Sequence, residues 1–201
     1  MLKNIAHIGA SLAIGVIVAA FALQSSIHSA SAGSKADAIN DAERVLGFEV
    51  TMPAKRLTNV RFTDAEGAAV TLEDKRGTVV LMNFWATWCP PCVREMPSLE
   101  RLQTRLGNDG FEVVAINEDR EAAVIGPFYD HFGLRELRGY HDPSGRLSRK
   151  LKITGLPTTI LIDHRGYEVG RVVGGVEWDS PASIALMRYY LTLPMSAASA
   201  E

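Results

Sequence analysis

Two cysteines, Cys89 and Cys92, lie in the stretch NFWATWCPPCVREMP at residues 83–97, and no other cysteine occurs in the chain. Two prolines separate them. A pair at this spacing can be a structural disulfide, part of a metal site, a haem attachment point or a redox-active dithiol. These four interpretations differ in what else they require from the chain, so the sequence can be used to compare them.

Three of the four interpretations find little support. A disulfide that closes so short a loop restrains the unfolded chain by only about 2 kcal/mol, and an exported domain of this size has a sufficient core without it. A zinc site needs four donors, but His131, His141 and His164 lie far apart in the sequence. Haem attachment requires a histidine directly after the second cysteine, and position 93 is valine.

The position of the pair favours redox chemistry. Val79–Phe84 has the composition of a buried strand and Pro90–Leu106 that of a helix, so Cys89 falls at a helix N-terminus. The helix dipole and the free N–H groups there lower the pKa of a thiol. The two prolines fit because the first helical turn does not need their missing N–H groups. We therefore expect Cys89 to be exposed and to attack first, and Cys92 to be the partly shielded resolving thiol.

The elements around the pair predict the fold class. Further strands are expected at residues 60–63, 69–71, 111–117, 158–162 and 168–173, and further helices at 36–46, 122–132, 146–151 and 180–193. Thr71 and Asp74 have the spacing of a capping box for one helical turn. Strands and helices alternate before a final hairpin and helix, which predicts an α/β fold with a mixed central sheet flanked by helices.

The residues around the pair also resemble a known family. WATWCPPC after an apolar strand, with Pro97 five residues past the second cysteine and GLPTT downstream, resembles a thioredoxin-fold active site. Over about residues 48–193 the chain is similar to the TlpA/ResA-like family of membrane-anchored extracytoplasmic thiol-disulfide oxidoreductases. The helix at 36–46 and the stretch GGVEW at 174–178 resemble the TlpA branch in particular. The resemblance implies a thioredoxin-like fold.

The resemblance assigns roles to individual residues. It implies that Cys89 and Cys92 are catalytic and that Pro157 is a cis-proline facing them, against which the substrate backbone would lie. The residues expected to contact the substrate are Trp88, Pro90, Pro91 and Leu156. Trp85 is expected in the core instead. No cofactor and no bound metal are expected.

One departure from the thioredoxin pattern concerns proton transfer. Thioredoxin has a buried aspartate where this chain has Asn83, so Cys92 needs another proton acceptor. TlpA/ResA-like proteins place an acid after the second strand of the pattern, which implies that Glu118 is the catalytic acid, with Asp119 as a second candidate. Burial would raise the pKa of such a carboxyl group and suit it to proton transfer. The alternative is a solvated acidic loop whose charges pair locally.

The N-terminal residues predict export. Lys3 precedes an apolar run without charge, Ile8–Leu23, and Ala30-Ser31-Ala32 is a candidate cleavage site. The run is long for a signal-peptide core and close to the lower limit of a spanning helix. Residues 1–33 are therefore expected to be a signal anchor or a cleaved signal, residues 34–194 the thioredoxin-like domain, and residues 195–201 a flexible tail. We expect a periplasmic domain tethered to the inner membrane, with a cleaved soluble form as the alternative.

These features together predict an extracytoplasmic thiol-disulfide oxidoreductase. The resemblance favours a reductant that receives electrons from a membrane donor of the DsbD/CcdA type. Its substrates would have paired cysteines, as in apocytochrome c, a copper chaperone or the copper-site subunit of cytochrome oxidase. A disulfide-donating oxidant and a copper-binding assembly factor remain alternatives. The net charge of -2 gives no reason to expect nucleic acid as a partner.

The remaining basic residues are expected to have no special role. A cluster near the predicted short helix is typical of a solvated helix face, with docking of a partner as the alternative. Its members are Arg146, Arg149, Lys150 and Lys152.

Overall fold

The computed structural model describes residues 36–194. The predicted anchor at Ile8–Leu23, its cleavage site and the tail after residue 194 lie outside the described residues. Of the described residues, those numbered 39–194 belong to one compact unit. Within the described part of the chain, no helix is both long enough and apolar enough to cross a membrane.

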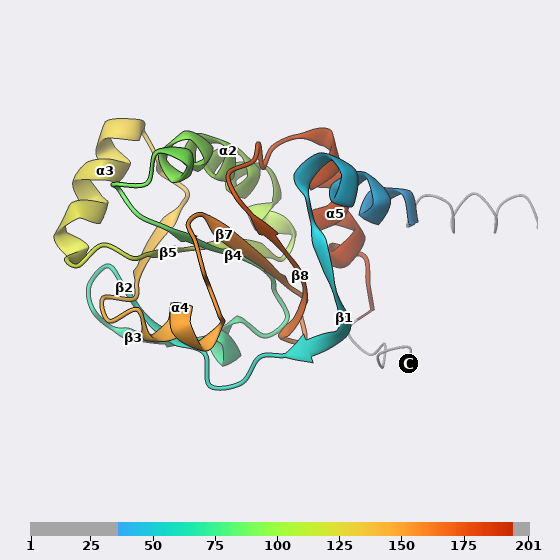
Figure 1. The fold of residues 1–201 in the computed structure, drawn as a ribbon, viewed down its shortest axis with the longest axis horizontal. Coiled ribbons are helices and arrows are strands. Elements are labelled where there is room, and N and C mark those ends of the chain that lie inside the picture. Colours follow the sequence, from blue (N-terminus) through green and yellow to red (C-terminus); the bar gives the residue numbers. More distant parts are fainter. Residues whose placement is uncertain (1–35, 195–201) are drawn as a thin grey trace, which may run out of the picture. The chain divides into compact units, whose positions relative to one another are not determined.

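An eight-stranded mixed sheet forms the centre of this unit (Figure 1). Its strands are β1 (Glu49–Arg56), β2 (Arg61–Asp64), β3 (Ala69–Thr71), β4 (Val79–Trp85), β5 (Phe111–Asn117), β6 (Arg138–His141), β7 (Thr158–Ile162) and β8 (Tyr167–Val173). Their order across the sheet is β1-β8-β7-β4-β5-β6-β2-β3. β4 pairs in parallel with β5 and antiparallel with β7, so the strand that leads to the cysteines lies in the middle of the sheet. The predicted mixed sheet is confirmed.

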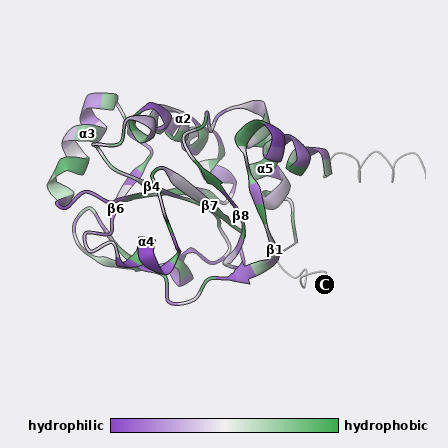
Figure 2. Cartoon of the chain, viewed as in Figure 1, coloured by the Kyte–Doolittle hydropathy of each residue, from purple (hydrophilic) through white to green (hydrophobic). Residues whose placement is uncertain are grey.

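Helices cover both faces of the sheet. One face carries α2 (Pro90–Leu106), α3 (Ile125–Phe132), α5 (Pro181–Leu191) and the helix over residues 36–46, all of which contribute to one apolar cluster. The other face carries α4 (Arg146–Lys150) and the 3-10 turn η1 (Leu72–Lys75), whose apolar residues belong to a second cluster. Figure 1 shows α2 and α4 on opposite sides of the central strands, and Figure 2 shows α4 as largely hydrophilic.

The sequence of β4 explains why both faces can be covered. Every residue of this strand is buried. Because side chains alternate across a strand, Val79, Leu81 and Trp85 pack into the cluster under α2, whereas Val80, Met82 and Phe84 pack into the cluster under α4. A near-continuous apolar run is what a strand covered on both faces requires.

The predicted elements are confirmed with small changes. The Thr71–Asp74 capping box is present at η1. The helix predicted over residues 122–132 is divided into a 3-10 turn, η3 (Ala122–Val124), and α3. Two strands were not predicted: β1, which contains a proline and lies at one edge of the sheet, and β6, which is only four residues long. An edge strand tolerates a proline, which weakens the strand pattern of β1, and the four residues of β6 are too few to show a pattern.

Candidate active site

Cys89 and Cys92 form a disulfide at the start of α2, with their Cα atoms 5.3 Å apart. Cys89 is the N-cap of the helix, and its Sγ accepts a hydrogen bond from the backbone N–H of Cys92 at 3.3 Å. Pro90 and Pro91 occupy the first helical positions, as predicted. A sulfur at the N-cap lies where the helix dipole stabilises a thiolate.

The exposure predicted for Cys89 is wrong in this disulfide form. Cys89 is only 4% exposed and Cys92 is fully buried. The Sγ of Cys89 is turned back over the first helical turn, because it is bonded to the Cys92 sulfur and caps the Cys92 N–H. The order of access is still the predicted one, since Cys89 is the more accessible of the two.

The two tryptophans near the pair have different environments. Trp88, directly before Cys89, is 66% exposed. Trp85 is fully buried, as predicted, and its ring lies 4.8 Å from that of Phe128 and 6.0 Å from that of Tyr129. Trp88 is therefore available to a partner, whereas Trp85 supports the core beneath the cysteine loop.

A cis peptide bond joins Leu156 to Pro157, which confirms the cis conformation that the resemblance implied. Pro157 is buried and directly precedes β7. The first residue of β7, Thr158, pairs with Phe84 of β4 and with Val173 of β8. Pro157 therefore lies at the end of β4 from which the chain leaves toward the cysteines. Leu156 is half-buried, and Val173, which the sequence analysis did not single out, is 58% exposed.

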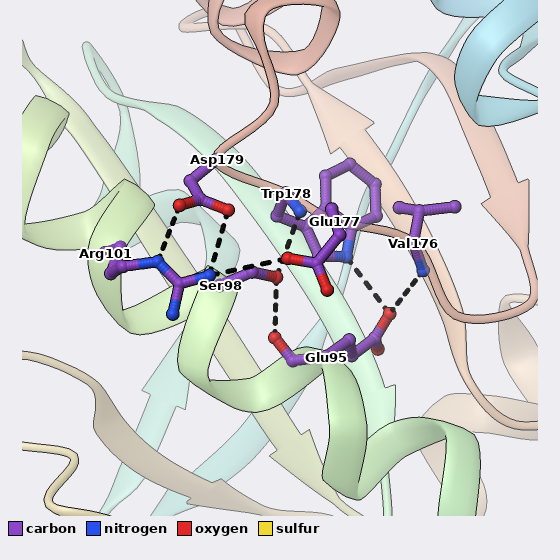
Figure 3. A network of polar contacts seen from close by, with 7 residues as sticks. All are labelled: Glu95, Ser98, Arg101, Val176, Glu177, Trp178 and Asp179. Carbon is purple, nitrogen blue, oxygen red and sulfur yellow. Dashed lines mark hydrogen bonds and ion pairs between the residues drawn. The ribbon is translucent and has the colours of Figure 1, made fainter.

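An acid on the helix of the cysteines was not predicted from the sequence. Glu95 is 2% exposed and lies three residues after Cys92. Residues at this spacing are neighbours on one helix face. Its Oε1 accepts a hydrogen bond from Asn83 Nδ2 at 2.7 Å, and its Oε2 accepts from Trp178 Nε1 at 3.1 Å and from the Val176 N–H at 3.3 Å. Figure 3 shows the contacts with Val176 and Trp178.

The pKa of Glu95 is suited to proton transfer. Burial raises it to about 7, although the hydrogen bonds from Asn83, Trp178 and the Val176 N–H act in the opposite direction. A carboxyl group with such a pKa can accept or donate a proton near neutral pH. One signal in the sequence could have revealed it: Glu95 is flanked by residues of the apolar face of α2, where an unpaired charge is unexpected.

Glu118 is held differently. It follows β5, and its backbone N–H donates to the carbonyl oxygen of Trp85 at 2.8 Å. Burial and the nearby Asp142 carboxylate raise its pKa to about 7, while Ser148 and Arg149 lower it. Its Oε1 is buried without a hydrogen-bond partner. The side chain thus faces the segment around α4, and its predicted role toward Cys92 stays a prediction.

Asp119 braces the segment that precedes the cysteines. Its carboxylate accepts hydrogen bonds from the Thr87 N–H at 2.8 Å, the Thr87 hydroxyl at 2.9 Å and Asn117 Nδ2 at 2.8 Å. Asp119 is 8% exposed, so the interpretation as a solvated acidic loop does not apply to it. Its oxygens are occupied by contacts that fix the backbone two residues before Cys89.

Two members of the basic cluster have structural partners. Lys150 Nζ donates to the carbonyl oxygens of Thr58 and Asn59 at 2.8 and 2.6 Å, and Arg149 Nη2 donates to that of Ser144 at 2.8 Å. These contacts tie α4 to neighbouring loops. Across residues 36–194, no group of three or more His, Cys, Asp or Glu side chains is arranged to hold a metal ion.

A disulfide at a helix N-terminus, a cis-proline at the adjacent strand end and a mixed sheet covered on both faces define the thioredoxin-like class. The Redoxin family model matches residues 50–185. The thiol-disulfide oxidoreductase ResA of Bacillus thuringiensis is 32% identical over 120 residues, which cover 60% of this chain and 69% of that protein. ResA of Halalkalibacterium halodurans is 34% identical over 122 residues, covering 61% and 69%.

Solved structures support the same assignment. A Chlorobium tepidum protein assigned as thiol:disulfide interchange protein DsbE is 30% identical, with a TM-score of 0.63 over 69% of this chain and 96% of that one. A Bacteroides vulgatus thiol-disulfide oxidoreductase is 25% identical, with a TM-score of 0.58 over 67% and 94%. The chain belongs to the Redoxin family and, within it, to the TlpA/ResA-like thiol-disulfide oxidoreductases.

Proposed function

We propose that this thiol-disulfide oxidoreductase acts outside the cytoplasm as a reductant of protein disulfides during the assembly of cytochrome c or of the copper centre of cytochrome oxidase. The observation that carries the chemistry is the Cys89–Cys92 disulfide at the start of α2, with Cys89 as the N-cap and the more buried Cys92 three residues before Glu95 on the same helix. The assembly pathway and an electron donor of the DsbD/CcdA type are supported by the resemblance to the TlpA/ResA-like family.

The proposed reaction proceeds in two exchanges. In the first, the Cys89 thiolate attacks a disulfide of the substrate, which forms a mixed disulfide and releases one substrate thiolate. In the second, Cys92 loses its proton and attacks the Cys89 sulfur, which releases the other substrate thiolate and leaves the Cys89–Cys92 disulfide. Two electrons pass to the substrate, and the membrane donor returns two electrons to the pair.

We propose that Glu95 accepts the proton that Cys92 loses in the second exchange. Glu95 lies on the same helix face as Cys92 and is the more buried of the two candidate acids. Glu118 is the other candidate, and its contacts lie with Asp142 and the α4 segment. A carboxyl group that titrates near pH 7 can hold the proton in the attacking step and return it to a leaving thiolate.

The substrate is proposed to lie across the surface next to Cys89. Trp88 and Val173 are the exposed apolar side chains there, at 66% and 58% exposure. Pro157 and Leu156 line the strand end between them, and the exposed Pro90 and half-buried Pro91 begin the helix. An extended segment around a substrate disulfide would place its backbone against Pro157.

Covalent trapping tests this function. Cys92→Ser removes the resolving thiol, so the mixed disulfide should accumulate as adducts that dithiothreitol dissolves. Cys89→Ser is the matched control and should trap little, because the remaining thiol is fully buried. We expect proteins with paired cysteines and the membrane donor among the adducts. Equal trapping by both variants, or by neither, would contradict the attacking and resolving roles.

The direction of electron flow is tested by the reduction potential. A value of about -270 mV or below, measured for the Cys89–Cys92 pair in a dithiothreitol or glutathione buffer, supports a reductant. A value of about -120 mV is that of a strong oxidant and would overturn this part of the proposal.

We also propose that residues Ile8–Leu23 tether the domain to the inner membrane. A donor in the same membrane would then meet the protein in two dimensions. N-terminal sequencing of the mature protein tests the tether. A mature chain that starts at Gly33 would show that Ala30-Ser31-Ala32 is cleaved and that the domain is released.

A further inference from the structure

The segment of residues 174–179, between β8 and α5, touches both halves of the disulfide site. The backbone N–H of Gly174 donates to the carbonyl oxygen of Pro157 at 2.9 Å. Gly175 packs against the cysteine loop so closely that a Cβ on it would lie 3.1 Å from the carbonyl oxygen of Pro91. The segment therefore joins the cis-proline to the prolines between the cysteines.

The same segment supplies two of the three hydrogen bonds to the Glu95 carboxylate, from the Val176 N–H and from Trp178 Nε1 (Figure 3). Trp178 is 1% exposed, so its indole has little freedom to leave this position. Its backbone N–H donates to the Oγ of Ser98 at 3.0 Å, and that hydroxyl donates to the carbonyl oxygen of Glu95 at 2.7 Å. The indole is thus held at both its ring and its backbone against one turn of α2.

An ion pair fastens the end of the segment to the same helix. Arg101 Nε and Nη2 contact the two carboxylate oxygens of Asp179 at 2.5 and 3.1 Å, and Nη2 lies 3.4 Å from Glu177 Oε2. This two-point geometry fixes direction as well as distance. Figure 3 shows Arg101 and Glu95 on α2, with Asp179 next to Arg101 and with Trp178 and Val176 next to Glu95.

We infer that Trp178 is a positioning residue, which holds the Glu95 carboxylate ionised and oriented through its indole N–H. The inference rests on the proposed function for its consequence, because Glu95 matters to catalysis only as the proton acceptor of Cys92. A donor that binds the charged form of an acid favours that form. Without the indole N–H, the buried charge keeps only Asn83 and the Val176 N–H as donors.

Few other charges act on Glu95. On the 174–179 segment the charged group is Glu177, whose charge opposes ionisation of Glu95. On its own helix Cys92 is bonded to Cys89 in the oxidised protein and carries no charge. The groups that face it from β4 and β7 are the amide of Asn83 and, behind that amide, the hydroxyl of Thr159, which are both uncharged. A change at Trp178 should therefore alter the pKa of Glu95 mainly through the lost hydrogen bond.

Titration of Glu95 in the oxidised full-length protein tests the inference. The probe is the side-chain carboxyl carbon, followed by NMR and assigned by its loss in Glu95→Gln. Trp178→Phe removes the N–H but keeps an aromatic ring, and should move the midpoint upward by about one pH unit or more. Trp85→Phe is the matched control, since this indole is equally buried and its Nε1 has no hydrogen-bond partner. It should leave the midpoint in place.

A second variant avoids the core. Arg101→Lys keeps the positive charge but loses the planar two-point contact with Asp179. It should move the Glu95 midpoint in the same direction by a smaller amount, about half a pH unit. If Trp178→Phe does not fold, an unchanged midpoint in Arg101→Lys overturns the inference. So do equal shifts in Trp178→Phe and Trp85→Phe.

The kinetics of disulfide exchange test the positioning role of Trp178 and the proton-acceptor role of Glu95 separately. In Trp178→Phe the pH profile of the resolving step should follow the Glu95 midpoint upward, and the rate should recover to that of the unmodified protein at alkaline pH. A profile that stays in place while the midpoint moves supports the positioning role and overturns Glu95 as the acceptor for Cys92. An unmoved midpoint overturns the positioning role whatever the exchange rate does.

Discussion

Glu95 and Glu118 both lie beside β4, and burial raises the pKa of each to about 7, yet their surroundings differ. Glu95 contacts β4 through Asn83, and Glu118 contacts it through the carbonyl oxygen of Trp85. Both oxygens of Glu95 accept hydrogen bonds. One oxygen of Glu118 has no partner, and a second carboxylate, Asp142, faces it.

A similar pKa in the two acids arises from different physical causes. The ionised form of Glu95 is opposed by burial and, to a smaller extent, by the charge of Glu177, and it is supported by donors in fixed positions. The ionised form of Glu118 is opposed by burial and by a like charge. A group with pre-arranged donors can change its charge without rearrangement of its surroundings, which suits it to repeated proton transfer.

Replacement of each acid by glutamine should produce the largest difference between the two sites, in the rate of the resolving step. Glu95→Gln should slow the resolving step by about 10²–10³-fold at pH 7, because a positioned acid–base group contributes on this scale. Glu118→Gln should slow it by less than about tenfold. Rapid-quench measurement of the mixed disulfide in each variant decides between them. The reverse order of effects would restore Glu118 to the role that the sequence predicted.

The pH dependence of stability should also differ between the two acids. A carboxyl group with a raised folded-state pKa binds its proton more tightly in the folded protein, so its stabilising contribution is full below pH 4.5 and is lost as the pH rises toward 7. For Glu95 the loss should be about 3 kcal/mol. Urea unfolding of the oxidised protein at pH 4.5 and pH 7.5 should show it.

The glutamine variants show which acid causes this pH-dependent loss of stability. Glu95→Gln should remove most of the difference in the free energy of unfolding between the two pH values. Glu118→Gln should remove less, since water screens its half-buried carboxyl group. A pH dependence that survives in Glu95→Gln would show that other groups cause it.

A second carboxyl group beside Glu95 should produce an intermediate effect. Asn83→Asp replaces the amide that donates to Glu95 with the acid found in thioredoxin. Two carboxyl groups at this distance do not both ionise easily, so the free energy of unfolding at pH 8 should fall by about 1–2 kcal/mol more than at pH 5. Asn117→Asp is the matched control beside Asp119 and should leave the titration of Glu95 unchanged.

The smallest effect is expected around Glu118. Arg149 lowers the pKa of this acid, so Arg149→Ala should raise it. The rise should be less than about one pH unit, because the guanidinium is exposed and screened by water. NMR titration of the Glu118 carboxyl carbon measures it. A parallel change at Glu95 would contradict the separation of the two sites.

Much of the fold could be predicted because its central elements carry strong local patterns. β5 and α2 have the predicted bounds, since an apolar run and a helix that begins with two prolines are unambiguous. β1 and β6 were missed for the opposite reason. Each depends on pairing with a neighbouring strand. The short alternation of Val50, Met52 and Ala54 in β1 contains Pro53, and β6 has only four residues.

The sequence by itself determined the part of the site that depends on neighbours along the chain. Cys89, the two prolines and Cys92 lie within four positions, so the helix cap and the reactive pair follow from local geometry. The tertiary structure alone decided how the acid on the cysteine helix is buried and hydrogen-bonded. Burial raises the pKa of Glu95, and the hydrogen bonds from Asn83, Trp178 and Val176 lower it; Val176 and Trp178 are 81 and 83 residues away along the chain. Loss of water and the direction of distant donors are properties of the packed molecule, and they cannot be read from a spacing of residues.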